Sequence, residues 1–251
     1  MATLKAYFDD SERNVITFSG YLGTADQWED FELRWDRLLK LHSIPYFHMK
    51  EFAPSVGAFS SWKDDENRRR ELVQDICAMI DGLGVRSVSA SLDCSTIRVR
   101  EGEKFDELPL AVAVCMRELL GLTWKPQGLY DSVECICDRM DDPFNIQAKA
   151  EEYILRSHPK VREWWQSGCV TITPLRKEDS WREIRPIQIA DFLAWESRNG
   201  AEIKLGYKQQ GGHWSGDRVS AVSLAMASGG NSRMYSATSV EDVVDNLTAK
   251  S

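Results

Sequence analysis

The chain has 251 residues, of which 43% are hydrophobic and 28% charged. This balance is typical of a compact globular protein and excludes disordered, collagen-like and coiled-coil chains. The 39 acidic and 31 basic residues give a net charge of −8, which argues against a protein that coats nucleic acid through its overall charge. No apolar run reaches the roughly 20 residues of a membrane span, and the first residues lack a signal-peptide pattern. We therefore expect a cytoplasmic protein with no membrane contact.

Apolar periodicity and turn residues predict the elements in chain order. The pattern predicts strands at 4–9, 14–21, 85–92, 132–137 and 169–174, with helices that start at Thr24 and cover 63–83, 108–122, 145–157 and 186–198. The polar segment DDSER between the first two strands favours a hairpin. Gln27, three residues after Thr24, completes a capping box. An extended segment at 44–52 and a loop with Pro54 and Gly57 separate the first two helices.

The order of these elements predicts an α/β fold. Strands separated by helices need crossover connections, so the sheet should be parallel after the opening antiparallel hairpin. We expect a mixed sheet of about five strands, flanked by helices, over residues 1–205. Residues 206–251 should form a helical C-terminal appendage packed on the same domain, with helices at 219–227 and 240–247.

Acidic residues occur at positions where an acid is locally unfavourable. Asp9 and Asp10 end the first strand and Asp138 ends the strand VECIC, although aspartate is poorly suited to strands. Asp191 lies inside the apolar helix IQIADFLAW, where an uncompensated charge is expensive. Ligands of α/β sheets gather at the carboxyl ends of strands, so these acids can form one site. Gln188 shares the helix face of Asp191.

Converging carboxylates repel one another unless a cation lies between them. Their hard oxygen atoms suit Mg²⁺ or Mn²⁺, and two such ions about 3.5–4 Å apart can activate water against a phosphodiester. Zinc is disfavoured, because the six cysteines form no CxxC pair. The alternative is purely structural: Asp9 and Asp10 begin a turn, Asp138 caps a helix and Asp191 bonds a backbone amide.

The motif residues resemble the domain-of-unknown-function 3800 family, DUF3800, which is usually placed with the ribonuclease H-like fold. Members open with a strand ending in Asp-Glu-Ser, carry a middle strand ending in Asp, and close with Gln-x-Ala-Asp on a helix. The matching segments here are YFDDS, ECICDRMD and PIQIADFLAWE, with Asp10 where the family usually has Glu. The resemblance covers residues 1 to about 200, and the Gln-x-Ala-Asp helix is its most specific part. It implies a metal-dependent nuclease-like site.

Strand alternation assigns roles to the candidate ligands, Asp9, Asp10, Asp138 and Asp191. Because neighbouring strand residues face opposite sides, we expect Asp9 to bind the ion directly and Asp10 to support it from behind. Asp138 would bridge beside Asp9, and Asp191 would complete the site from the helix. Gln188 would orient a water or a ligand. Further support behind the ligands is expected from Ser11 and from the segment YFHMKEF with its residues His48 and Glu51.

Basic residues cluster around the candidate helix despite the net charge. Arg182, Arg185 and Arg198 bracket it, and Trp195 is among the tryptophans interleaved with them. Such a mixture can contact phosphates and stack bases, so DNA or RNA is the expected substrate.

Other readings of the sequence remain open. A catalytically silent ribonuclease H-like module that binds nucleic acid, a protein partner or a second copy of the chain is the main alternative. FDDSE also resembles the nucleophile motif of haloacid dehalogenase-like phosphatases, but neither Asp9 nor Asp10 has the required aspartate two residues later. A serine or cysteine hydrolase is disfavoured because the chain has no GxSxG element.

Overall fold

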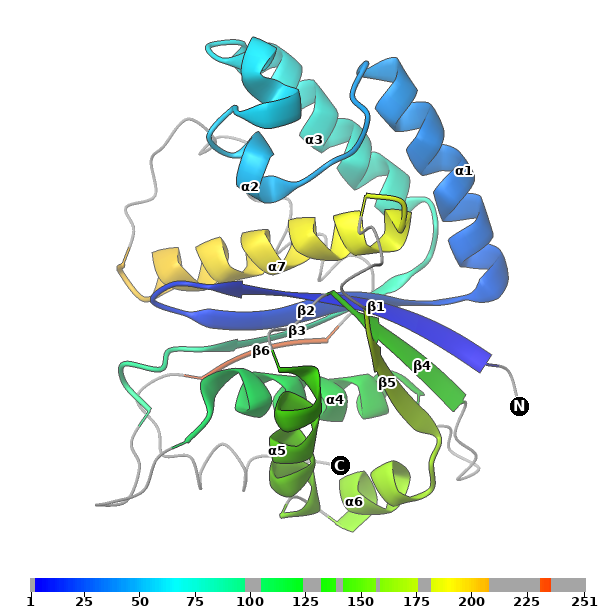
Figure 1. The fold of residues 1–251 in the computed structure, drawn as a ribbon, viewed down its shortest axis with the longest axis vertical. Helices are drawn as coiled ribbons and strands as arrows, with labels where there is room; N and C mark the ends of the chain where they lie inside the picture. Colours follow the sequence, from blue (N-terminus) through cyan, green and yellow to red (C-terminus); the bar gives the residue numbers. More distant parts are fainter. Residues whose placement is uncertain are drawn as a thin grey trace.

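A six-stranded mixed sheet crosses the middle of the computed structural model, with helices on both faces (Figure 1). The structure describes residues 3–97, 105–123, 132–138, 142–156, 159–175, 182–207 and, for the backbone only, 231–235. The helices predicted at 219–227 and 240–247 lie outside the described residues.

The sheet has the order β5-β4-β1-β2-β3-β6. Its strands are β1 (Thr3–Glu12), β2 (Ile16–Thr24), β3 (Arg86–Leu92), β4 (Ser132–Cys137), β5 (Val170–Pro174) and β6 (Asn231–Tyr235). Strand β2 is antiparallel to β1 and β3, and the remaining neighbours are parallel. An opening hairpin followed by parallel strands is therefore confirmed. The sixth strand corrects the expectation for the tail: part of the predicted helical appendage pairs with β3 and extends the sheet.

The helices follow the predicted pattern with two additions and one change. They are α1 (Ala25–Leu41), α2 (Met49–Phe52), the 3-10 helix η1 (Gly57–Trp62), α3 (Glu66–Asp81), α4 (Glu107–Thr123), α5 (Pro143–Leu155), α6 (Pro159–Gln166) and α7 (Arg185–Lys204). The Thr24–Gln27 capping box at the start of α1 is confirmed. The segment predicted as extended over 44–52 ends in α2, while η1 and α6 were not predicted. Within the described residues, no helix has the length and apolar character needed to cross a membrane.

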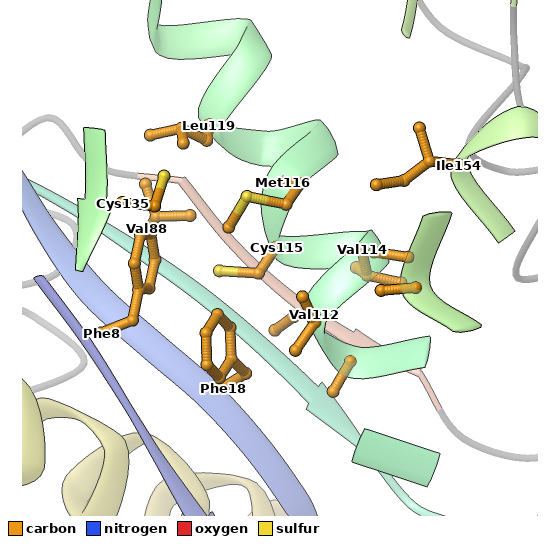
Figure 2. Packing of buried hydrophobic residues seen from close by; sticks show 14 of the residues in the cluster. Phe8, Phe18, Val88, Val112, Val114, Cys115, Met116, Leu119, Cys135 and Ile154 are labelled. Carbon is orange, nitrogen blue, oxygen red and sulfur yellow. The ribbon is translucent and has the colours of Figure 1, made fainter. Parts of the chain in front are cut away.

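One face of the sheet is covered by α4, α5 and α6 (Figure 1). Helix α4 is buried along most of its length, which fits its almost continuously apolar sequence. Its residues Cys115 and Met116 lie above Phe8, Phe18 and the side chains of β4 (Figure 2). Phe8 and Phe18 stack with their ring centroids 5.0 Å apart. This apolar layer fixes β1 beside β4.

The opposite face carries α7, and α1, α2 and α3 form a further layer outside it (Figure 1). The strands beneath α7 present small hydroxyl side chains rather than large apolar ones. The Ser19 and Ser89 hydroxyls lie 2.6 Å apart, and those of Thr17 and Ser91 lie 2.8 Å apart. Because these buried hydroxyls hydrogen-bond to one another across β2 and β3, α7 can lie close to the sheet without leaving them unpaired. Its position brings Asp191 toward the ends of the strands.

Candidate active site

Strand β1 carries the first acids. Tyr7 faces the α7 side of the sheet and Phe8 the α4 side, so alternation returns Asp9 to the α7 side. The Asp10 amide donates a hydrogen bond to Asp9 Oδ1 at 2.8 Å. Among the described residues, the pairing of β1 with β4 ends at Phe8. Both Asp9 and Asp10 line the same cleft, although they point to opposite sides of a regular strand.

Strand β4 brings the next acid to the same place. Phe8 is paired with Cys137, and the amide of Asp138 donates to the Phe8 carbonyl at 2.9 Å. The expected adjacency of the strands bearing Asp9 and Asp138 is confirmed, although 128 intervening positions separate these acids in the sequence. Parallel pairing explains this meeting, because it aligns the carboxyl ends of both strands at one edge.

Helix α7 supplies Asp191 from above the sheet. Its Oδ2 accepts a hydrogen bond from the Met49 amide at 2.6 Å, so the backbone-amide alternative holds for this oxygen. The same side chain lines the cleft together with Asp9 and Asp138. The two readings of Asp191 are thus compatible: the amide holds the carboxylate in position while the carboxylate faces the other acids.

The cleft that these acids share has a volume of about 710 Å³. It contains seven of the predicted site residues: Asp9, Asp10, Ser11, His48, Asp138, Asp191 and Arg198. Four further polar or aromatic side chains line it that are not among the predicted site residues, namely Glu12, Arg13, Lys50 and Trp195. Trp195 and Arg198 follow Asp191 at helical spacing, and this spacing is the signal that could have placed both on one face.

Burial dominates the electrostatics of the acids in the cleft, and their mutual repulsion adds to it. Burial raises the pKa of Asp9 well above its usual range, and the charges of Asp191, Asp10 and Asp138 raise it further. Burial, with the charge of Asp138, raises the pKa of Asp191 to about 7, against the Met49 amide, Lys50 and Arg198, which lower it. At neutral pH the acids therefore need a shared proton or a cation.

His48 lines the cleft and faces its acids from the segment before α2. Burial lowers the pKa of His48, although the charges of Glu51 and Asp138 oppose that shift. This shift favours the neutral form of its imidazole at pH 7.

Glu51 has a structural role outside the cleft. Its carboxylate accepts hydrogen bonds from the Tyr46 hydroxyl at 3.0 Å and 3.1 Å and from the Ala58 amide at 3.0 Å. Gly57 has a positive φ of 54°, and a Cβ there would collide with the Glu51 carboxylate. Glu51 thus holds together the loop that forms the wall, and its charge acts on His48, so its support from behind the ligands stays a prediction.

Gln188 does not line the cleft, in contrast to the role predicted for it. It is completely buried, and its Oε1 accepts from Trp35 Nε1 at 3.1 Å and from the Phe47 amide at 2.8 Å. Its Nε2 donates to the Arg182 carbonyl at 2.8 Å. These bonds leave no place for a water or ligand to be oriented. Gln188 instead ties α1 and the segment before α2 to α7.

We expect Gln188→Met to lower the free energy of unfolding by about 2–5 kcal/mol, because it leaves the buried Trp35 and Phe47 N–H groups without an acceptor. Urea denaturation measures this change. Gln74→Met, on the exposed side of α3, is the matched control and should shift stability by less than about 0.5 kcal/mol. A Gln188→Met protein as stable as the control would contradict the structural role.

Two of the three predicted substrate-binding arginines are engaged elsewhere. Arg185 Nε donates to Asp36 Oδ1 at 2.7 Å, which joins α7 to α1. The Arg182 guanidinium lies 4.7 Å from the centre of the Tyr46 ring. Neither side chain lines the cleft, whereas Arg198 does. The charge of Arg182 nevertheless helps to lower the pKa of His48 in the cleft, and substrate binding by Arg182 and Arg185 stays a prediction.

The carboxylate oxygens of Asp9, Asp10, Asp138 and Asp191 fit Mg²⁺ or Mn²⁺ by donor chemistry, and their repulsion is the kind that such an ion relieves. Across the residues that the structure describes, no three histidine, cysteine, aspartate or glutamate side chains are grouped to hold an ion as they stand. Rotation of the carboxylates would have to accompany binding.

Among family models, curated proteins and solved structures, the chain has no match.

Proposed function

We propose that the protein is a divalent-metal-dependent, nuclease-like phosphodiesterase that acts on nucleic acid and has a ribonuclease H-like fold. The observation that carries the proposal is the convergence of Asp9, Asp138 and Asp191 on one cleft from two adjacent strands and a crossing helix. Acidic residues that share no role would not be expected to gather in one cleft from three separate elements. The mixed sheet, with its opening hairpin, is the arrangement that the family resemblance implies.

The acids are the groups that would hold the metal. Asp9 and Asp138 would bind it directly from the strand ends, with Asp191 on α7 and Asp10 on β1 beside them. A bound Mg²⁺ or Mn²⁺ supplies Lewis-acid activation of water and stabilisation of the leaving oxygen. The neutral His48 imidazole, on the same cleft, can accept a proton from water that attacks the phosphorus. The Met49 amide keeps Asp191 oriented toward the other acids.

Nucleic acid is the favoured substrate class because cationic and aromatic groups surround the acids. Arg13 and Lys50 are exposed at the cleft, where they can contact phosphates on either side of a reacting bond. Trp195 adds an aromatic surface on the same helix as Asp191. Acids still outnumber bases in the cleft lining, so phosphate binding there would depend on a metal ion bound by the acids.

One observation favours the catalytically silent module as a second candidate. The Met49 amide already occupies Asp191 Oδ2, so this carboxylate has a structural partner without any metal. In that case the cleft binds nucleic acid or a protein partner but breaks no bond.

Cleavage of end-labelled oligonucleotides tests the proposal. We expect the protein to cut DNA or RNA, single- or double-stranded, only when Mn²⁺ or Mg²⁺ is present. The double variant Asp9→Asn/Asp138→Asn, purified identically, should lose this cleavage and so exclude a contaminating nuclease. If the wild-type protein binds the oligonucleotides but cuts none of them in either metal, the silent module is correct. Equal cleavage by the double variant would overturn the proposed site.

A further inference from the structure

Arg198 occupies a special position beside the acids. Asp191, Trp195 and Arg198 lie along one face of α7, and all three line the cleft. The Arg198 side chain is only 4% exposed, and its Nη1 donates to Ser11 Oγ at 2.8 Å. Ser11 follows Asp9 by two residues in β1, so it lies on the same strand face. The guanidinium therefore lies at the floor of the cleft, between the end of β1 and α7.

The charge of Arg198 is directed at the acid cluster. A guanidinium remains protonated in proteins, so its burial requires negative charge nearby. Asp191 and Glu202 provide that charge, and Arg198 in turn lowers the pKa of Asp191. Within the described residues, Nε and Nη2 of Arg198 have no hydrogen-bond partner. Glu202 does not line the cleft, whereas Arg198 does, so the charge of the guanidinium acts on Asp191 there.

We propose that Arg198 is a built-in cation on the Asp191 side of the cluster, so that the cleft takes one divalent ion, between Asp9 and Asp138, rather than two. A second ion beside Asp191 would meet the repulsion of a fixed positive charge in a partly desolvated place. It would also compete with the Met49 amide for Asp191 Oδ2. The first ion has neither obstacle, because Asp9 and Asp138 lie at adjacent strand ends.

Arg198 is thus a positioning residue, since it acts on the metal through the acids. Its removal should raise the affinity of the cleft for a divalent cation, whereas ordinary structural damage would lower it. Loss of the positive charge that acts on Asp191 makes the cleft more attractive to a divalent cation, by roughly tenfold in affinity. A variant that merely loosened the cleft would bind the cation more weakly.

Titration of the intact protein with Mn²⁺ alone, followed by calorimetry and by the electron-spin signal of free Mn²⁺, tests this inference. The wild-type protein should bind one ion. Arg198→Met should bind the first ion about tenfold more tightly or take up a second, and Arg198→Lys should behave as the wild type. Arg37→Met, an exposed arginine of α1 outside the cleft, is the matched control and should leave binding unchanged.

The outcomes separate this inference from the proposed function, on which it rests. Two ions of similar affinity in the wild type would overturn the role of Arg198, and this readout does not depend on whether a variant folds. Weaker Mn²⁺ binding by a folded Arg198→Met protein would overturn it as well. One ion bound without any cleavage would support the inference while refuting the nuclease activity. Absence of Mn²⁺ binding by the wild type would refute both.

Discussion

Asp191→Asn should make the metal-free protein more stable at pH 7.5 and at the same time abolish its metal-dependent activity. Asparagine keeps the shape of the side chain and an oxygen that can accept from the Met49 amide, so the link between α7 and α2 survives. What disappears is a buried charge that repels Asp9 and Asp138. We expect a gain of about 2–4 kcal/mol in the free energy of unfolding. The rate of cleavage should fall by at least roughly 100-fold. Even the loss of a residue that only supports a metal ligand lowers metal affinity or activity by about 10- to 100-fold.

Urea denaturation without metal and oligonucleotide cleavage with Mn²⁺ measure the two effects on the same preparation. Asp64→Asn is the matched control: Asp64 is exposed, and its positive φ of 67° suits asparagine, so one negative charge is removed far from the acids in sequence. That variant should retain both properties of the wild type. An Asp191→Asn protein that unfolds more readily, but still cleaves, would show that Asp191 serves the fold alone.

The strands and the acids at their ends could be predicted because their causes are local. Aspartate at the end of an apolar strand is conspicuous in any sequence, and parallel pairing then brings separate strand ends together. The burial of the serine face of β3 has a less local cause. Ser89 and Ser91 find their partners on β2, and α7 covers them only after the chain has folded.

The roles of the polar residues around the acids could not be predicted, since they depend on contacts over long sequence separations. Gln188 looks like part of the site because it precedes Asp191 by one turn, yet its partners are Trp35 and Phe47 on distant elements. Arg185 likewise donates a hydrogen bond to a residue far away in the sequence, Asp36 of α1. Sequence proximity and helical spacing select a face of α7, but the packing of α1 over its first turn decides which residues reach the cleft.

The metal-free protein should lose stability between about pH 4 and pH 7 through its acid cluster. An aspartate has a pKa of about 3.9 in the unfolded chain, whereas burial and the charge of Asp138 raise that of Asp191 to about 7 in the fold. Between these values the folded state binds more protons than the unfolded state. Stability from this source is complete below the lower value and falls as pH rises through the upper one, by about 1.4 kcal/mol per unit for each extra proton.

Comparison with Asp191→Asn isolates this contribution from all other carboxylates. The difference in the free energy of unfolding between variant and wild type should be small at pH 4, grow through pH 6 and level off above pH 7. Mn²⁺ should reverse the order at pH 7.5, because it binds the ionised wild-type cluster and stabilises the folded state by mass action. At pH 5 protons occupy the same oxygens, and the metal should have little effect on either protein. A difference that does not vary with pH would mean that Asp191 is already neutralised within the fold, and no repulsion would then be left for a metal ion to relieve.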